Sequence, residues 1–221
     1  MRRLTILSAE PLDYYDISPE VSEKTAVFPG DRPYRRTVAQ VFSKGDSLVL
    51  SSLQTTVHLG AHADAPSHYH PLGKDISERP LHYYLGPCQV VAVHLPRGRR
   101  IMPDDLNLGQ ISAKRLLFKT GSFPNPDHWN DDFNSLSPQL IEALATRKVV
   151  LVGIDTPSID PEDSKALESH QAVYRRDMAI LEGLSLEQVP EGVYDLVALP
   201  LRLKGADASP VRAILLKRTA P

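Results

Sequence analysis

The segment His58-Leu-Gly-Ala-His62-Ala-Asp64-Ala-Pro-Ser-His68 gathers side chains that bind metal ions. Three of the eight histidines of the chain lie within it. A helix would turn Asp64 about 240° away from His58, so one helical face could not present both. In an extended chain, by contrast, all four of these His and Asp positions point to the same side. The segment is therefore predicted to be a strand whose polar side chains converge.

That strand must bend if its histidines are to share an ion. Fully extended, His58 and His62 would lie about 13 Å apart. Gly60 lacks a Cβ and permits a bulge between them, and Pro66 forbids regular strand pairing beyond it. Two imidazoles and a carboxylate suit Zn²⁺, with Mn²⁺ or Fe²⁺ as alternatives. Surface or helix-capping histidines are the competing explanation, but the shared side of the four positions favours a metal site.

The rest of the chain alternates strand-like and helix-like stretches. Ser137 can cap a helix over Pro138–Thr146, with Pro138 at the first helical position. Shorter helices are predicted near 104–107 and 164–174. β-branched and apolar runs predict two strands in 38–58 and further strands at 89–95, 116–119, 149–154, 192–203 and 211–217. We therefore expect a single α/β domain over residues 1–221, with a mixed sheet.

Composition narrows the class of function. The chain has 221 residues, of which 42% are hydrophobic, and a net charge of −2, which gives no sign of a nucleic acid or anionic membrane partner. Cys88 is the only cysteine, so an intramolecular disulfide is impossible and a metal site must use His and carboxylate ligands. The apolar stretch within Met1–Leu12 is too short for a signal peptide, and no window is long enough to span a membrane. A small-molecule substrate and a cytoplasmic location are expected.

The pattern His-x-Gly-Ala-His-x-Asp-Ala-Pro-x-His resembles the signature of the cyclase-type metal-dependent hydrolases. Within them it is most similar to the bacterial kynurenine formamidases (arylformamidases), a branch favoured by Ala61 and by His68-Tyr69. Residues 15–31 and 153–161 resemble two further blocks of that family. Together the blocks cover about residues 14–200, nearly the whole chain.

The resemblance implies a swivelling β/β/α fold and a site that holds two zinc ions, with Mn²⁺ as an alternative. By this resemblance, His58, His62 and Asp64 would hold the first ion, and Asp64 would bridge to the second. The family's remaining ligands are a His and a Glu twelve residues apart. His170 and Glu182 have that spacing here, and His170 is the only histidine beyond residue 128. Taken alone, Glu182 would be a surface carboxylate of a helix. The implied ligand set is His58, His62, Asp64, His170 and Glu182.

The resemblance also implies an activity, namely hydrolysis of N-formyl-L-kynurenine to L-kynurenine and formate by a homodimer. His68 is not needed as a ligand and is the expected proton donor and acceptor, because an imidazole can both accept and donate a proton. An additional metal ligand is the other role open to it. Phe28, where relatives often carry Trp, is expected to lie against the aromatic ring of the substrate.

Other interpretations remain open at this stage. The first is another amide or lactam hydrolase of the same superfamily, acting on isatin-like rings, and the second is a non-catalytic protein that binds metal or a small molecule. A serine or cysteine hydrolase is disfavoured, because no Gly-x-Ser-x-Gly motif occurs. Asp155 and Asp160 could orient histidine ligands or could simply form turns. Trp129 could cover the pocket.

Overall fold

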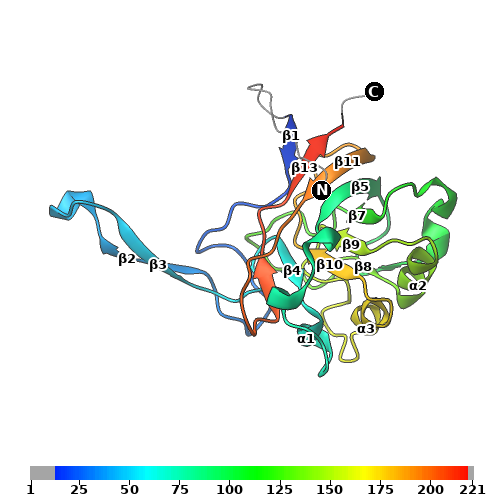
Figure 1. Cartoon of the computed structure of the whole chain (residues 1–221), viewed down its shortest axis with the longest axis horizontal. Coiled ribbons are helices and arrows are strands. Elements are labelled where there is room, and N and C mark those ends of the chain that lie inside the picture. Colours follow the sequence, from blue (N-terminus) through cyan, green and yellow to red (C-terminus); the bar gives the residue numbers. More distant parts are fainter. Residues whose placement is uncertain (1–12, 219–221) are drawn as a thin grey trace, which may run out of the picture.

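The computed structural model describes residues 13–218. This part of the chain is built around a nine-stranded mixed sheet (Figure 1). The predicted α/β fold with a mixed sheet is confirmed. The segment Met1–Leu12, to which the sequence assigns no role, lies outside the described residues. Among the described residues, no helix is both long enough and apolar enough to cross a membrane.

In sheet order the strands are β1 (Tyr14–Asp16), β13 (Ile214–Lys217), β11 (Gly192–Val197), β5 (Leu85–Ala92), β7 (Arg115–Lys119), β9 (Leu151–Ile154), β10 (Ala179–Glu182), β4 (His62–Asp64) and β12 (Ala208–Pro210). Strand β4 lies near one edge, between β10 and β12. Parallel pairing is confined to the middle of the sheet, where β5, β7, β9 and β10 are neighbours, and the flanking pairs are antiparallel.

Each face of the sheet carries its own hydrophobic core. Strand β7 shows how the alternation works: Leu116 and Phe118 belong to one core, and Leu117 belongs to the other. Helices α2 (Pro138–Thr146) and α3 (Glu168–Arg175) pack on the Leu116 face and lie side by side (Figure 1). Helix α2 has the predicted bounds. Its cap is also as predicted, since Ser137 Oγ accepts a hydrogen bond from Leu140 N at 3.1 Å.

Several predicted bounds were wrong. The strand expected over 192–203 ends at Val197, shortly before Pro200, which has no N–H to donate to a strand neighbour. The helix expected over 164–174 begins only at Glu168, because Leu167 has a left-handed backbone with φ 47°. The helix near 104–107 is one short 3₁₀ turn. The remaining short elements are η1 (Phe42–Lys44), α1 (Pro66–Tyr69), η2 (Ile76–Glu78), η3 (Leu81–Tyr83), β6 (Arg100–Ile101), η4 (Pro103–Asp105), η5 (Leu108–Gln110) and β8 (Ser135–Leu136).

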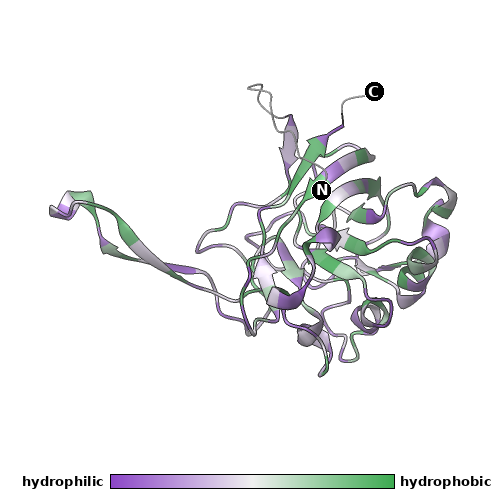
Figure 2. Ribbon diagram, viewed as in Figure 1, coloured by the Kyte–Doolittle hydropathy of each residue, from purple (hydrophilic) through white to green (hydrophobic). Residues whose placement is uncertain are grey.

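A two-stranded arm projects from the body of the molecule (Figure 1). It consists of β2 (Arg35–Gln40) and β3 (Leu50–Gln54), paired antiparallel, and every residue of both strands is exposed. Two strands were predicted in this region, but not their separation from the sheet. Hydrophobic stretches run along the arm (Figure 2). Its exposed apolar side chains are Val38, Phe42, Leu48, Val49, Leu50 and Leu53.

Candidate metal centre

Strand β4 places His62 and Asp64 on the same side of the sheet, as the predicted alternation requires. Its antiparallel neighbour β10 brings Glu182 directly opposite His62. The turn after Glu182 depends on glycine, because Gly183 has φ 64° and a Cβ there would collide with the carbonyl group of Gly60. The close approach of these two backbones therefore fixes the carboxylate of Glu182 beside the imidazole of His62, with Oε2 3.3 Å from Nε2.

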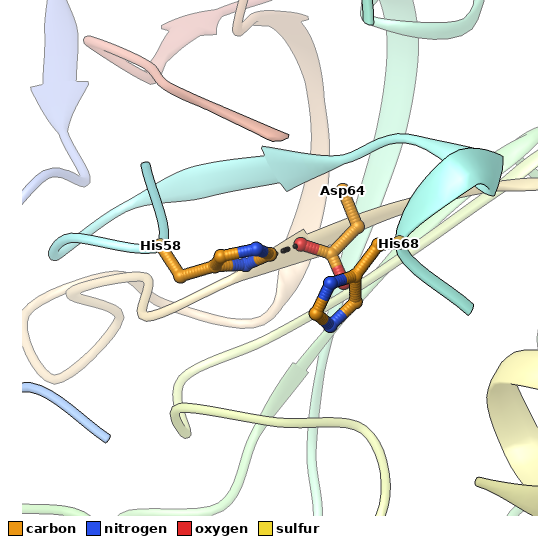
Figure 3. A group of neighbouring side chains, drawn as sticks. All are labelled: His58, Asp64 and His68. Carbon is orange, nitrogen blue, oxygen red and sulfur yellow. Dashed lines mark ion pairs between the residues drawn. The ribbon is translucent and has the colours of Figure 1, made fainter. Parts of the chain in front are cut away.

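The predicted bend at Gly60 is present, with a left-handed φ of 55°. It turns His58 back, so that its Nδ1 lies 3.1 Å from Oδ1 of Asp64 (Figure 3). His68 also lies beside Asp64, but it does not belong to the strand. Pro66 begins the short helix α1, and His68 reaches the cluster from that helix. The expectation that all four positions converge through strand alternation was wrong for His68, although the convergence itself occurs.

His170 comes from helix α3, which lies much later in the sequence than β4. Its Nε2 lies 3.4 Å from Oδ2 of Asp64 and 3.6 Å from Oε1 of Glu182. His62, Asp64, His170 and Glu182 are each at most 3% exposed. The structure thus brings together all five residues expected to be metal ligands, with His68 at the exposed edge of the group.

The nitrogen that faces away from the cluster has a hydrogen-bond acceptor in two of the buried histidines. His62 Nδ1 lies 2.8 Å from the carbonyl oxygen of Gly60, and His170 Nδ1 lies 2.8 Å from Oδ2 of Asp160. Each acceptor holds a proton on that outer nitrogen, so in the neutral imidazole the lone pair lies on Nε2, which is directed into the cluster. This is the arrangement found around histidines that bind metals.

The electrostatics of the cluster fit a bound cation. Both carboxylate oxygens of Asp64 are fully buried, and the polar groups beside them are imidazole nitrogens, at 3.1 Å for His58 and 3.4 Å for His170. Burial would raise the pKa of Asp64, but the charge of His58 and the hydrogen bonds from His170 and His58 hold it well below its usual range. Burying a carboxylate is costly unless it is paired with positive charge, and a bound cation is one way to offset that cost.

The same carboxylates act on the histidines. Burial alone would lower the pKa of His58, but the charge of Asp64 and hydrogen bonds to Asp64 and Asp207 raise it to about 10. Burial likewise opposes a charge on His170, yet Asp160, Asp64 and Glu182 together raise its pKa to about 10. In the metal-free protein these two imidazoles therefore carry positive charge in the place of a cation.

The donor atoms form two groups that share one carboxylate. His58, Asp64 and His68 make up the first, and His62, Asp64 and Glu182 make up the second, with the ligand atoms in each group within 4.8 Å of one another. His62 also lies near His58, because both imidazoles approach Oδ1 of Asp64, at 3.5 and 3.1 Å, while His170 approaches Oδ2 at 3.4 Å. Asp64 is common to both groups, the position that a bridging carboxylate would occupy.

Two aspartates outside the cluster differ in their roles. Asp160 accepts a hydrogen bond from His170, as expected if it orients a histidine ligand. Asp155 does not touch the described ligands: its carboxylate accepts hydrogen bonds from Thr120 N, Thr120 Oγ1 and Gly121 N, so it shapes a turn. Asp207, which contacts His58 and His68, escaped the sequence analysis because it lies far from the motif with no pattern of its own.

The cluster lies in a cleft of about 510 Å³. One wall of this cleft is aromatic and includes Phe28, Phe123 and Trp129. Phe28 packs edge-on against Trp129, with 5.2 Å between ring centroids and 72° between the ring planes. The cleft can therefore hold a flat aromatic group close to the cluster of histidines and carboxylates.

Comparisons with known proteins agree with this geometry. Residues 15–161 match the family model Cyclase, described as "Putative cyclase". The kynurenine formamidase of Bordetella petrii is 47% identical over 91% of this chain and 96% of its own length, and that of Maricaulis maris is 43% identical over the same shares.

Solved structures show the same fold. A structure described as a potential metal-dependent hydrolase with cyclase activity superposes with a TM-score of 0.81 at 29% identity, covering 95% of this chain and all of that one. Isatin hydrolase A from Labrenzia aggregata, at 20% identity and a TM-score of 0.78 over 93% of each chain, shares the fold alone. The chain therefore belongs to the cyclase family of metal-dependent hydrolases, on its kynurenine formamidase branch.

Proposed function

We propose that this protein hydrolyses N-formyl-L-kynurenine to L-kynurenine and formate. The observation that carries the proposal is the cluster around Asp64, whose histidines and Glu182 line a cleft with an aromatic wall. The activity named for relatives that are 43–47% identical supports this choice of substrate. Formylkynurenine combines the two features that the cleft would recognise, an aromatic ring and an amide carbonyl.

The metal complement in this proposal is two zinc ions per chain, with Mn²⁺ as the alternative. Imidazole and carboxylate donors suit Zn²⁺, and the absence of a cysteine from the cluster leaves Mn²⁺ open. His58, His62, Asp64, His170 and Glu182 would hold the ions, with Asp64 shared between them. Bound divalent ions supply Lewis acidity, which lowers the pKa of water and polarises the formyl carbonyl group.

His68 is the proposed proton carrier. Hydrolysis adds water across the amide: the water oxygen bonds to the formyl carbon, the C–N bond breaks, and one water proton must reach the anilide nitrogen. An anilide anion leaves poorly, so the nitrogen needs that proton as the bond breaks. The side chain of His68 is 33% exposed and lines the cleft, where it can accept the proton from water and return it to the leaving nitrogen.

Phe28 is the proposed contact for the aryl ring of the substrate. Its ring is 38% exposed, lines the cleft and is braced by Trp129. Phenylalanine offers a stacking face but no N–H donor, so it would orient the ring through shape rather than through a hydrogen bond.

A homodimer in the cytoplasm completes the proposal. The exposed apolar side chains of the arm, among them Phe42 and Leu53, support assembly, because scattered apolar groups are ordinary on a surface but a continuous apolar projection favours a protein contact. A second copy of the chain offers an equivalent arm. The single thiol, Cys88, is buried and free, which suits a reducing compartment.

The test combines metal analysis with an assay. Purified protein is expected to contain zinc and to hydrolyse N-formyl-L-kynurenine, to lose activity on chelation, and to recover it when zinc is returned. Activity that survives complete removal of metal would contradict the proposal. Bound metal without turnover of any formanilide would instead indicate a non-catalytic binding protein.

An isatin-like lactam is the second candidate substrate, because isatin hydrolases share the fold. Their identity to this chain is 20% or less, against 43–47% for the formamidases. Measuring kcat/KM for both substrates on one preparation separates the two candidates. We expect formylkynurenine to be the better substrate by a large ratio.

A further inference from the structure

Asp207 lies beside the cluster and has no part in the proposed function as described so far. It precedes β12, and its carbonyl oxygen accepts a hydrogen bond from Ala65 N at 2.8 Å. The next residue, Ala208, pairs with Asp64 across the sheet. The main chain therefore holds the carboxylate of Asp207 at the end of β4, where the cluster begins.

One carboxylate oxygen of Asp207 contacts two imidazole rings. Oδ2 lies 3.0 Å from Nε2 of His58 and 3.3 Å from Nδ1 of His68. The two rings are themselves close, with 4.2 Å between centroids and an interplanar angle of 44°. A carboxylate oxygen has lone pairs for two donors, so it can accept from both rings at once.

These contacts select one tautomer for each histidine. An ionised carboxylate only accepts hydrogen bonds, so His58 must carry a proton on Nε2, and His68 must carry one on Nδ1. The neutral form of His58 then has its lone pair on Nδ1, 3.1 Å from Asp64, which is the atom a metal ligand needs. His68 keeps Nε2 for proton exchange within the cleft that it lines.

We propose that Asp207 is a positioning residue for the hydrolysis, which holds His68 for proton transfer and His58 for metal binding. The inference rests on the proposed function and adds to it a residue from outside the sequence motif. The competing explanation is a surface carboxylate that merely keeps its loop closed, since the Asp207 side chain is 49% exposed.

The chain offers a matched control for that explanation. Oδ2 of Asp75 accepts a hydrogen bond from Gly205 N at 2.7 Å, so Asp75 ties down the loop that carries Asp207. The contacts found for Asp75 are with this loop and with its own helical turn, not with the histidines. Asp75→Ala therefore loosens the loop while the carboxylate of Asp207 is kept.

The experiment compares Asp207→Ala, Asp207→Asn and Asp75→Ala with the wild-type chain. For each, kcat and KM for N-formyl-L-kynurenine are measured at saturating zinc, zinc affinity is measured by competition with a chelator, and thermal unfolding checks the fold. We expect Asp207→Ala to lower kcat and zinc affinity by about 10- to 100-fold each, with KM little changed. Asp207→Asn keeps an acceptor oxygen and should recover part of both, while Asp75→Ala should leave both unchanged.

Distinct outcomes overturn the inference. Unchanged kcat and zinc affinity in Asp207→Ala would refute it, and equal losses in Asp75→Ala would reduce Asp207 to a loop residue. Weaker zinc binding with unchanged kcat would remove its role towards His68. If the wild-type chain does not hydrolyse formylkynurenine, the proposed function fails, but the zinc affinities still decide whether Asp207 holds His58.

Discussion

The cluster of histidines and carboxylates around Asp64 buries polar side chains, whereas the arm exposes apolar ones. In the cluster, carboxylates such as Asp64 and Glu182 are almost completely buried. In the arm, apolar side chains such as Phe42 and Leu53 are 65% and 62% exposed. Both arrangements carry a free-energy cost, since water solvates a carboxylate well and an apolar side chain poorly.

The two regions also differ in how they are specified. The cluster requires β4, β10, α1 and α3 to meet, so it depends on the whole fold. The arm requires only that β2 and β3 pair with each other. Bringing charged side chains together in this protein therefore needs tertiary structure, whereas the apolar surface of the arm needs local structure alone. We expect cations to neutralise the carboxylates of the cluster and another copy of the chain to cover the apolar side chains of the arm.

The largest effect is expected at the centre of the cluster. Asp64→Asn should lower hydrolytic activity and zinc affinity by more than about 100-fold, because losing even an outer partner of a metal ligand costs 10- to 100-fold. In the metal-free protein the same change leaves the charged imidazoles of His58 and His170 without their shared counter-charge, so the metal-free variant should unfold at a lower temperature than the metal-free wild type. Activity assays and thermal unfolding with and without zinc check both parts. A metal-free variant as stable as the metal-free wild type would show that Asp64 does not stabilise the charged imidazoles.

His68→Ala tests whether the exposed edge of the cluster differs from its buried centre. This variant should retain its metal but lose about 10²- to 10⁴-fold in kcat, the range typical of a general acid or base. Metal content per chain, measured beside kcat, separates the two properties. Loss of metal would reassign His68 as a ligand, a role that its proximity to His58 and Asp64 permits.

The charge balance of the cluster predicts that the stability of the metal-free protein and its affinity for zinc change with pH in opposite directions. His58 and His170 have pKa values raised to about 10 without metal. Their contribution to the stability of the metal-free protein is therefore complete below the unfolded pKa of about 6.5 and is lost as the pH rises through about 10.

Zinc affinity should change in the other direction, because zinc binds the neutral imidazoles and must displace their protons. From pH 7 to 9 the affinity should rise, and binding should release about two protons per chain. Calorimetry in buffers of different ionisation enthalpy counts those protons. Binding without proton release would mean that His58 and His170 are already neutral.

The arm is tested by the double substitution Phe42→Ser with Leu53→Ser. If the arm lies in a dimer interface, each lost side chain weakens association by up to about 1.5–3 kcal/mol, while the fold of the body is unaffected. Sedimentation velocity over a range of concentrations measures the change. Leu72→Ser is the matched control, since Leu72 is an 83% exposed apolar residue of the body. Identical behaviour of the two variants would rule out the arm as the interface.

The smallest effect is expected at Phe28, which lies in sequence between β1 and the arm and lines the cleft. Phe28→Leu removes the aromatic face and should raise KM about 2- to 10-fold, the equivalent of about 0.5–1.5 kcal/mol for an aromatic contact. Phe28→Trp keeps that face and should change KM less. Steady-state kinetics on both variants make the comparison, and an unchanged KM for Phe28→Leu would remove Phe28 from the substrate contacts.

Local rules predicted part of the site correctly. Alternation along a strand placed His62 and Asp64 on one side, and the lack of a Cβ at Gly60 identified the bend, where the structure has a φ of 55°. Ser137 as the N-cap and Pro138 at the first helical position predicted correctly where α2 begins. Each of these features depends on residues within a few positions of one another.

Tertiary contacts account for what the sequence did not predict. Asp207 reaches His58 across 149 positions of sequence, and no periodicity marks it. The arm has the strand-forming residues of a sheet, yet it pairs with itself, because β-branched and apolar residues favour a strand without specifying its neighbour. His170 and Glu182 were found only through family resemblance, since their spacing of twelve residues has no meaning until α3 and β10 are in place.

The position of β4 between β10 and β12 has a consequence for how the protein matures. Both neighbours follow β4 by more than a hundred residues, since Asp64 pairs with Ile180 on one side and with Ala208 on the other. While the ribosome is still making the last third of the chain, the motif at residues 58–68 has neither strand beside it. Closing such long loops is slow, so the complete set of ligands forms late in folding. We therefore expect metal to be loaded last, so that it consolidates a nearly finished fold instead of nucleating it.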